Sequence, residues 1–348
     1  MRARASFVIK SPSRTTAREE SCLRQIFVWL LIFLPTLSIA HPGRTDGEGC
    51  HREGGVKHCH GNEPQVPPTT EPVLEVLSAG PSDAPEKKLV VMSWNIKHLG
   101  RKSLDPDTAS SFLQEADIIT LQEVNKSSSG NSALQAIAAS LAKRLGKKIC
   151  WGLSEVPSED SERYAYLWRD TAVAYVKSDG SILPTCPATA LTIRLGSKHH
   201  RSIRREPAYG LFYSRHQEKK FVLASIHLVP TKKKPQLEVE PLFDTFSEEP
   251  IPVIVAGDYN LDSSHPAFFA ARKRGFLPAM AQVKTSLKRK KRELGKAYDN
   301  FWSRGALLHS SKVVNLFKVL PDRSVSSIYN DISDHCPIQG VFTLGKSP

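Results

Sequence analysis

Between residues 89 and 343 the sequence repeats one pattern, in which a short apolar run ends in a polar residue that can take part in chemistry. Asn95 follows the run that ends at Trp94, and Glu123 follows the run that ends at Gln122. Short apolar runs bounded in this way are typical of buried β-strands. Because helical stretches separate many of the runs, the pattern predicts an α/β sandwich built from two sheets.

The apolar runs and the helical periodicity predict individual elements along this part of the chain. Helices are expected around 111–116, where a short helix closes, around 134–144, where apolar residues share one face, and near 266–274. Strands are expected at 89–94, 118–122, 164–168, 171–176, 209–213, 221–226, 253–256, 298–302, 313–319 and 338–343.

The chain is strongly basic, with a formal net charge of +13 over 348 residues. The first 40 residues hold six Lys or Arg and two Glu, so their removal leaves +9. Such a balance favours a polyanionic partner, either nucleic acid or an anionic membrane surface. Solubility alone is the alternative explanation, but the clustering of the positive residues favours a partner.

Residues 1–40 are typical of an export signal. Basic residues precede the apolar run 26–34, and Ser38-Ile39-Ala40 offers a small-x-small pattern for cleavage. The apolar run is short for a membrane span. We therefore predict a signal peptide cleaved after Ala40 and a secreted or periplasmic protein, with an uncleaved anchor as the alternative.

Residues 41–62 form a small His/Cys-rich unit that contains Cys50, His51, His58, Cys59 and His60. Imidazole and thiolate groups in this arrangement could hold Zn²⁺. A disulfide between the two cysteines, with histidines around it, is an equal alternative in an oxidising compartment. The unit resembles the short YHYH-type motif of some exported bacterial proteins, and this resemblance assigns no chemistry.

The segment 63–86 has the composition of a linker, because six prolines stand among Thr, Ser and Glu without apolar periodicity. A catalytic domain is expected at 87–348. Loss of the signal would leave five cysteines, so at least one has no partner within the chain. A Cys50–Cys59 bridge is plausible, and a Cys150–Cys186 bridge is the weaker expectation.

Polar residues beside the predicted strands form one series of amides, carboxylates and imidazoles. Any one of them could be a turn former, whereas the whole series indicates a common site. Their oxygens suit Mg²⁺, Mn²⁺ or Ca²⁺, and their imidazoles can activate water and protonate a leaving oxygen. Together they favour hydrolysis of phosphodiesters. The series is Asn95, Glu123, His227, Asp258, Asn260, Asp334 and His335.

With these residues the chain resembles the endonuclease/exonuclease/phosphatase superfamily, in its deoxyribonuclease I-like branch. The matching motifs occur in the family's order and cover residues 89–343. The resemblance implies a four-layer α/β-sandwich, with two packed mixed sheets flanked by helices, and metal-dependent cleavage of phosphoesters. The motifs are Trp94-Asn95-Ile96, Leu121-Gln122-Glu123-Val124, Glu162-Arg163-Tyr164, Arg205-Glu206-Pro207, Ile226-His227-Leu228-Val229-Pro230, Gly257-Asp258-Tyr259-Asn260, Tyr298-Asp299 and Ser333-Asp334-His335.

The resemblance also implies a role for each matching residue. Glu123 and Asn95 correspond to ligands of the main metal, and Asp258, Asn260 and Asp334 to residues that bind the phosphate or a second ion. Glu162 corresponds to the partner of His227, and Asp299 to the partner of His335. We therefore expect catalysis at His227, His335, Glu162 and Asp299, metal at Glu123, Asn95, Asp334 and Asp258, and substrate phosphate at Asn260 and Arg205.

Two features separate branches of the superfamily. His227 and the Arg205 motif resemble the nuclease branch, since apurinic-site enzymes usually lack this histidine. In contrast, Asn125 stands where deoxyribonuclease I has an arginine that touches the minor groove, and Lys126 is a possible substitute. Basic segments at 198–205, 232–234 and 288–292 fit sequence-independent binding of phosphates, although each alone is more often a solvated face.

The sequence therefore predicts a monomeric, exported endonuclease that cuts DNA, and possibly RNA, with low sequence specificity. Mg²⁺ is the expected cofactor, with Mn²⁺ or Ca²⁺ as alternatives, and Zn²⁺ in the N-terminal unit is a further option. Two alternatives stay open. One is a secreted phospholipase C of sphingomyelinase type, and the other is a non-catalytic surface protein that binds polyanions.

Overall fold

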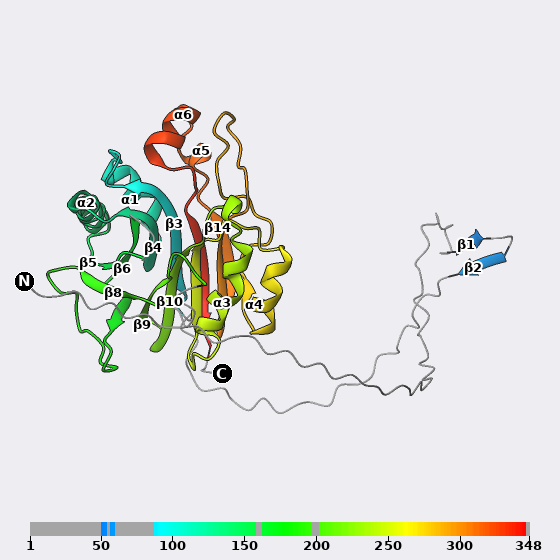
Figure 1. The fold of residues 1–348 in the computed structure, drawn as a ribbon, viewed down its shortest axis with the longest axis horizontal. Helices are drawn as coiled ribbons and strands as arrows, with labels where there is room; N and C mark the ends of the chain where they lie inside the picture. The colour runs from blue at the N-terminus through cyan, green and yellow to red at the C-terminus, as the bar shows by residue number, and fades with distance from the viewer. Residues whose placement is uncertain (1–49, 54–55, 60–86, 158–161, 197–201, 346–348) are drawn as a thin grey trace, which may run out of the picture. The chain divides into compact units, whose positions relative to one another are not determined.

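The protein is described by a computed structural model, which covers residues 50–53, 56–59, 87–157, 162–196 and 202–345 (Figure 1). The chain divides into two units, Met1–Ala79 and Gly80–Pro348. In the first, β1 (Cys50–Glu53) pairs antiparallel with β2 (Val56–Cys59), so the backbone of Cys50 lies opposite that of Cys59. The predicted signal 1–40, the linker 63–86, His60 and residues 198–201 lie outside the described residues. The predicted domain division stays a prediction.

The second unit is built on a long, curled β-sheet that folds into two facing halves. In one half the strands run in the order β14–β15–β3–β4–β6–β5, and in the other β12–β13–β11–β10–β9, with β7 also paired to β9. Strand β8 (Leu191–Leu195) joins the halves, because it pairs with both β5 and β9. The first half comprises β3 (Leu89–Leu99), β4 (Ile118–Asn125), β5 (Ile149–Ser154), β6 (Glu162–Arg169), β14 (Ala306–Val313) and β15 (Ile338–Leu344). The second comprises β7 (Val173–Val176), β9 (Ala208–Ser214), β10 (Lys219–His227), β11 (Val253–Asp258), β12 (Leu277–Pro278) and β13 (Asp299–Arg304).

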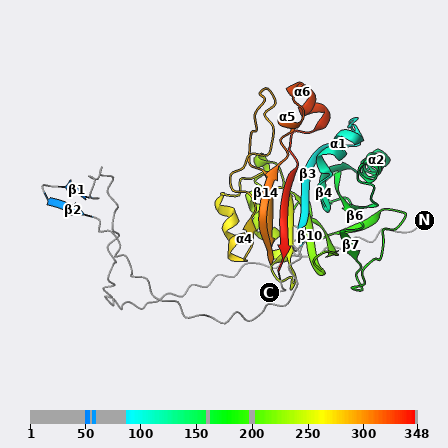
Figure 2. The ribbon, with the colours of Figure 1, turned by 180° about the vertical axis from the view of Figure 1, so that it is seen from behind.

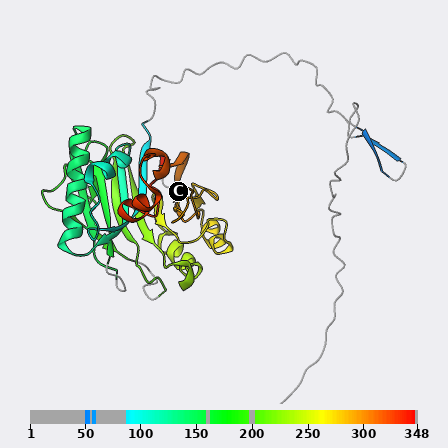
Figure 3. The ribbon, with the colours of Figure 1, turned by 90° about the horizontal axis from the view of Figure 1, so that it is seen from above.

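Helices cover the outer face of each half. Helices α1 (Pro106–Leu113) and α2 (Ser128–Leu145) pack on the first half, and their apolar residues join one core with β3 and β4. Helices α3 (Gln236–Phe246) and α4 (Phe269–Lys273), with the turn η2 (Pro266–Phe268), pack on the second half. A further core lies between the halves, where Val91, Phe212 and Phe301 are buried. The predicted four-layer α/β-sandwich is confirmed, as the views from behind and from above show (Figures 2 and 3).

Most predicted strands are present, but the region 313–319 was predicted wrongly as a strand. Strand β14 ends at Val313, and α5 (Leu316–Val319) begins after Asn315, whose side chain accepts a hydrogen bond from the Phe317 N–H. An N-cap of this kind favours a helical turn over continuation of a strand. The chain then forms α6 (Val325–Ser327) and a π-helical turn, η3 (Ile328–Ile332).

Helix boundaries also differ from those predicted. Helix α1 lies earlier than the predicted 111–116, because Pro106 opens it and Asp105 caps the Thr108 N–H at 2.8 Å. Helix α3 was not predicted, since Pro241 in its interior weakens the helical pattern.

The structure contains a Cys150–Cys186 disulfide, which was the weaker of the two bridges predicted from the sequence. Cys336 is a free, buried cysteine, and burial raises the pKa of its thiol to about 12. The Cys50–Cys59 bridge stays a prediction. Among the described residues, no helix is long and apolar enough to cross a membrane.

Candidate active site

The two pairs of parallel strands bring the predicted site residues to one end of the sandwich. Strand β3 runs parallel to β4, and β10 runs parallel to β11, so the carboxyl ends of each pair meet at the same edge. In this register His227 on β10 lies beside Asp258 on β11. Asp258 in turn lies beside Asp299 on the antiparallel strand β13. Three neighbouring strands therefore carry an imidazole and two carboxylates side by side.

Asn95 connects the two halves of the sandwich. Its Nδ2 donates hydrogen bonds to Glu123 Oε1 at 2.9 Å and to Asp258 Oδ2 at 3.2 Å. Asn95 and Asp258 are both 1% exposed. A buried carboxylate needs hydrogen-bond donors or a cation beside it, and Asn95 supplies donors to two carboxylates at once.

Two imidazoles lie close to the same oxygen of the Asp258 carboxylate. His227 Nε2 lies 3.5 Å from Asp258 Oδ2, and His335 Nε2 lies 3.6 Å from the same oxygen. His227 Nε2 is also 3.9 Å from Glu123 Oε1. Both rings are almost fully buried. The arrangement puts two groups that can transfer protons next to oxygen atoms that can hold a cation.

The His335 ring is oriented by the carboxylate that the sequence predicted. His335 Nδ1 lies 2.7 Å from Asp299 Oδ2, which also accepts a hydrogen bond from Thr285 Oγ1 at 2.6 Å. This contact leaves Nε2 as the nitrogen that faces the site.

Further hydrogen bonds fix the backbone of the loop before β15. Trp94 Nε1 donates to the His335 carbonyl at 2.9 Å. Ser333 Oγ donates to the Asn95 carbonyl at 2.7 Å and accepts from the His335 N–H at 3.0 Å. The loop is therefore tied to β3 at the residue that carries the Asn95 amide.

The two histidines have pKa values shifted in opposite directions. Burial lowers the pKa of His227 well below 6.5, and the positive charges of Arg205 and His335 add to this effect. Burial also opposes charge on His335, but Asp299 and Asp258 outweigh it and hold the pKa of His335 well above 6.5. Burial, together with the charge of Asp299, raises the pKa of Asp258 to about 6.

Glu162 contacts a histidine that the sequence analysis did not identify. Glu162 Oε1 lies 2.5 Å from His98 Nδ1, whereas the sequence predicted Glu162 as the partner of His227. Glu162 and His227 both line one small cavity of about 10 Å³, so a role of Glu162 toward His227 stays a prediction. His98 lies only three residues after Asn95, and its position just beyond a predicted strand end was the one signal that could have indicated it.

The predicted metal ligands do not all lie in one group. Asp334 is half-buried, and its Oδ2 lies 3.8 Å from Lys97 Nζ. Lys97 Nζ also donates to the Tyr329 carbonyl at 2.6 Å. A lysine this close reduces the negative charge that Asp334 offers to a cation. Its role in binding an ion or a phosphate stays a prediction.

Two of the remaining three predicted ligands, Glu123 and Asp258, fit a hard divalent cation, whereas Asn95 turns its Nδ2 toward them and its role as a ligand stays a prediction. Glu123 and Asp258 offer carboxylate oxygens on either side of the Asn95 amide. Among the described residues, no Lys or Arg forms an ion pair with Asp258, although this carboxylate is buried. Mg²⁺ and Ca²⁺ favour such oxygen ligands. A cation beside Asp258 would offset the loss of solvation on burial, which is the main cause of the raised pKa of this carboxyl.

The residues predicted to bind the substrate phosphate lie next to this group. The Asn260 backbone N–H donates to Asp258 Oδ1 at 2.8 Å, and the Asn260 Nδ2 donates to the Leu228 carbonyl at 3.0 Å. Arg205 lines the same small cavity as Glu123 and His227. Both positions are compatible with contact to a phosphate beside the two histidines, and the contact itself stays a prediction.

The basic segments differ in what they contact. Residues 232–234 are exposed, and the Thr231 hydroxyl just before them donates a hydrogen bond to the carbonyl of Asn260. In the segment 288–292, Arg292 instead donates to the carbonyls of Phe317, Leu320 and Arg323, so it holds the turn around α5. That part of the predicted phosphate-binding segment was interpreted wrongly, because a guanidinium fork also suits clustered backbone carbonyls.

Asn125, which stands where deoxyribonuclease I has its minor-groove arginine, has a structural role here. Asn125 is largely buried, and its Oδ1 accepts a hydrogen bond from the Ser127 N–H at 2.8 Å. Its side chain therefore shapes the entry to α2. Lys126 beside it is exposed.

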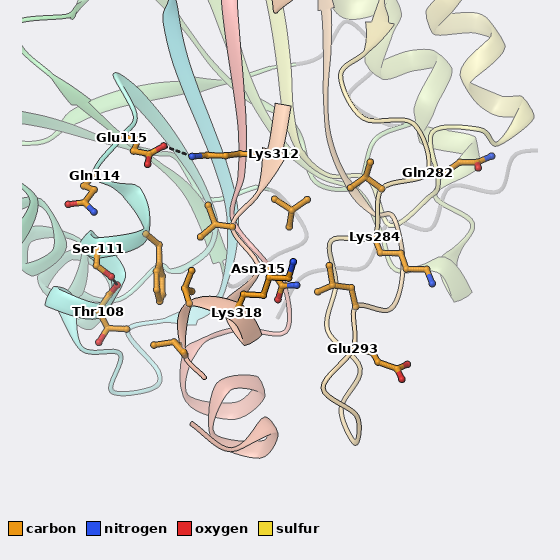
Figure 4. Close-up of a pocket in the computed structure, with 17 residues that line it drawn as sticks. Thr108, Ser111, Gln114, Glu115, Gln282, Lys284, Glu293, Lys312, Asn315 and Lys318 are labelled. Carbon is orange, nitrogen blue, oxygen red and sulfur yellow. Dashed lines mark hydrogen bonds and ion pairs between the residues drawn. The ribbon is translucent and has the colours of Figure 1, made fainter. Parts of the chain in front are cut away.

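A groove of about 1120 Å³ lies away from these residues, between α1, β14, α5 and the segment around 282–294 (Figure 4). Lys312 pairs with Glu115 across one part of it. The residues that line this groove include none of the predicted site residues. The chemistry therefore belongs to the smaller, buried cluster at the strand ends.

Comparison with known proteins finds a matching family and a named relative. The sequence profile of the endonuclease/exonuclease/phosphatase family matches residues 92–335. A protein named deoxyribonuclease from Thioalkalivibrio sp. (strain K90mix) is 24% identical over 276 residues, covering 73% of this chain and 71% of the relative.

Solved structures share the fold. An endonuclease/exonuclease/phosphatase family protein from Bacteroides thetaiotaomicron has a TM-score of 0.50 and 17% identity, covering 74% of this chain and 98% of its own. The human Nocturnin catalytic domain with bound sulfate anion has a TM-score of 0.50 and 16% identity, covering 74% of this chain and 94% of that domain. At these identities the likeness describes the architecture alone.

Proposed function

The chain belongs to the endonuclease/exonuclease/phosphatase family, and from that premise we propose that it is a divalent-metal-dependent endonuclease that hydrolyses phosphodiester bonds of DNA. The observation that carries this proposal is that His227 Nε2 and His335 Nε2 lie 3.5 and 3.6 Å from Asp258 Oδ2, with Glu123 Oε1 3.9 Å from His227 Nε2. In-line attack on a phosphodiester needs a base on one side of the phosphorus and an acid on the other.

Glu123 and Asp258 would hold the cation through carboxylate oxygens that suit Mg²⁺, Mn²⁺ or Ca²⁺. Asn95 would join them only with its amide turned over, because its Nδ2 faces the carboxylates and its Oδ1 accepts a hydrogen bond from the Lys97 N–H. When bound, the cation would stabilise the negative charge that develops on the phosphate oxygens. Asn260 and Arg205 lie beside this group and would orient the phosphate between the histidines.

The histidines divide the proton transfers between them. Asp299 holds His335 Nδ1, so Nε2 is the nitrogen that would give a proton to the leaving oxygen. His227 presents Nε2 to the same site and would take a proton from the attacking water. The opposite pKa shifts of the two rings agree with this assignment, because an acid must start protonated and a base must start neutral.

Three observations favour DNA as the substrate. The chain is strongly basic, and the exposed lysines 232–234 follow Thr231, whose hydroxyl donates a hydrogen bond to the carbonyl of Asn260. Positive charge around a cleft supports contact with a nucleic-acid backbone without reading its sequence. The relative from Thioalkalivibrio carries the name deoxyribonuclease. RNA is a second substrate to be tested with the same protein.

We also propose that the protein acts outside the cytoplasm, after export through residues 1–40. The Cys150–Cys186 disulfide supports this location, because disulfides persist in oxidising compartments. Mass determination of the N-terminus of protein recovered from the periplasm or medium tests it. A mature chain that begins at His41 is expected, and a full-length chain kept in the cytoplasm would contradict it.

A substrate panel tests the activity. Purified protein is incubated with Mg²⁺ and supercoiled plasmid, RNA, sphingomyelin vesicles or a simple phosphate monoester, and the initial rates are compared. We expect nicking of plasmid DNA to be the fastest reaction. Release of choline phosphate without nicking would favour a phospholipase, and DNA retention without any cleavage would favour a non-catalytic binding protein. Preferred hydrolysis of the monoester would identify a phosphatase.

A further inference from the structure

The two oxygens of the Glu123 carboxylate face different groups of side chains. Oε1 accepts a hydrogen bond from Asn95 Nδ2 and lies 3.9 Å from His227 Nε2, within the site described above. Oε2 lies 3.2 Å from His98 Nδ1 and accepts a hydrogen bond from the His98 backbone N–H, also at 3.2 Å. The second oxygen therefore belongs to a separate group that contains His98.

Glu162 completes this second group. Its Oε1 lies 2.5 Å from His98 Nδ1, and the ligand-type atoms of His98, Glu123 and Glu162 all lie within 4.8 Å of one another. The three residues come from the neighbouring strands β3, β4 and β6. A group built on paired strands keeps its geometry better than one built on loops.

We propose that His98, Glu123 and Glu162 form a binding site for Zn²⁺. One imidazole with two carboxylates suits this ion, whereas Mg²⁺ favours oxygen ligands only. Three protein ligands would leave one tetrahedral position for water or for a substrate oxygen. His98 is 47% exposed on its side chain, so an ion can reach the site from solvent.

The distances are close to those that a tetrahedral ion requires. With metal–ligand bonds of about 2.0–2.2 Å, two ligand atoms at a tetrahedral zinc lie about 3.3–3.6 Å apart. The 3.2 Å between His98 Nδ1 and Glu123 Oε2 is just below this range. The 2.5 Å contact between His98 and Glu162 would have to open by about 0.8–1.1 Å, through rotation of the side chains.

The backbone around the group is consistent with a specialised role. His98 has a φ of 53° and Glu123 a φ of 62°, a region that residues other than glycine rarely adopt. The register of β4 is shifted against both β3 and β6 at this place. These irregularities turn His98 and Glu123 toward each other, as bulges often do beside functional sites.

A competing explanation is an ion pair without a metal, in which protonated His98 lies between two carboxylates. Arg101 Nη1 lies 3.9 Å from Glu162 Oε1, and its positive charge opposes any added cation here, so this contact does not separate the two explanations. The ion pair and the zinc site differ in one measurable property. Only the zinc site predicts that replacing His98 changes the binding of an added dication.

Sharing of Glu123 has a consequence that rests on the proposed function. A cation at Oε2 withdraws negative charge from Oε1, so Zn²⁺ is expected to weaken the binding of Mg²⁺ by Glu123, Asn95 and Asp258. The zinc site itself is tested by binding alone. Its failure would therefore leave the proposed endonuclease activity unaffected, and a protein without nuclease activity could still have the site.

The test uses the full chain stripped of metal, in parallel as wild type, His98→Ala, Glu162→Gln and His335→Ala. Zn²⁺ is titrated by calorimetry, and Co²⁺ is added separately because its visible absorption reports four-coordinate sites. We expect His98→Ala and Glu162→Gln to lose one equivalent of Zn²⁺, or at least about 10-fold in affinity, together with the matching Co²⁺ absorption. His335→Ala removes an imidazole from the Asp258 group instead, and should keep this site.

Circular dichroism verifies that each variant is folded, and His309→Ala is the matched control, because His309 is an exposed histidine bonded only to Thr343 among the described residues. Equal binding of Zn²⁺ by wild type, His98→Ala and Glu162→Gln would overturn the proposal, as would loss of the Co²⁺ absorption in His335→Ala alone. An anomalous diffraction peak between His98, Glu123 and Glu162 would support it directly.

Discussion

His335 Nδ1 lies 2.7 Å from Asp299 Oδ2, deep in the end of the sandwich where the two halves of the sheet meet. Thr285 Oγ1 donates to the same carboxylate oxygen at 2.6 Å, so the position of Asp299 is fixed independently of the histidine. A carboxylate held in this way sets both the orientation of the imidazole and its affinity for a proton.

The Asp299→Asn variant should lower the pKa of His335, because the amide removes the largest charge that favours the imidazolium. In the metal-free wild type, the folded pKa of His335 is above the ordinary value of 6.5. The ion pair therefore stabilises the fold below about pH 6.5, and this stabilisation is lost as the pH rises through the folded pKa.

Urea unfolding of the wild type and Asp299→Asn in chelator, at about pH 6 and about pH 9, measures this effect. The wild type should exceed Asp299→Asn in free energy of unfolding, and this excess should be larger at about pH 6 than at about pH 9 by about 1 kcal/mol or more. A difference that does not change with pH would mean that Asp299 contributes only its hydrogen bonds. NMR titration of the His335 ring gives the pKa directly.

Replacement of either buried histidine should slow DNA cutting. His227→Ala and His335→Ala are each expected to lower the nicking rate by about 10²-fold or more, because each removes one partner of the proton transfers. His309→Ala is the matched control, since this exposed histidine lies on β14 and contacts Thr343. If one of the two buried positions can be replaced without loss of rate, that residue has no part in the chemistry.

The two most buried tryptophans offer a test of how the site loop is held. Trp94 and Trp302 are both 0% exposed. Trp94 Nε1 donates to the His335 carbonyl, whereas Trp302 Nε1 has no hydrogen-bond partner among the described residues. Trp94→Phe should therefore cost about 1–3 kcal/mol more in the free energy of unfolding than Trp302→Phe. Equal losses in urea unfolding would show that the Trp94 hydrogen bond is not important for stability.

The Cys150–Cys186 disulfide should stabilise the folded protein, because it closes a loop with a sequence separation of 36 residues. Cys186→Ala is expected to lower the free energy of unfolding by about 2–4 kcal/mol. Reducing agent should bring the wild type close to the variant and leave the variant unchanged. Equal stability of the oxidised wild type and Cys186→Ala would contradict this role.

Much of the fold and of the site could be predicted because the residues that can carry the chemistry stand at the ends of predicted strands. Asn95, Glu123, His227 and Asp258 each end a buried apolar run, and parallel pairing brings such ends together. The register then decides the contacts, as when His227 lies beside Asp258. Asp299 was predicted as the partner of His335 through the family resemblance, and the structure places the two in contact.

Other contacts depend on backbone irregularities that leave no pattern in the sequence. His98 reaches Glu123 and Glu162 because the chain leaves regular strand geometry after Asn95, with a positive φ at His98. The contact of Glu162 with His98 was therefore not predicted. Arg292 was interpreted as a phosphate contact because composition cannot tell an exposed guanidinium from one that binds backbone carbonyls.

The most direct test of the account is nicking of supercoiled plasmid by the purified protein with Mg²⁺, with Mg²⁺ and excess chelator, and with Glu123→Gln in place of the wild type. We expect cutting by the wild type with Mg²⁺, no cutting in chelator, and a rate lowered by about 10²-fold or more in Glu123→Gln. Cutting that persists in chelator, or a folded wild type that leaves DNA intact with Mg²⁺, Mn²⁺ and Ca²⁺, would contradict it.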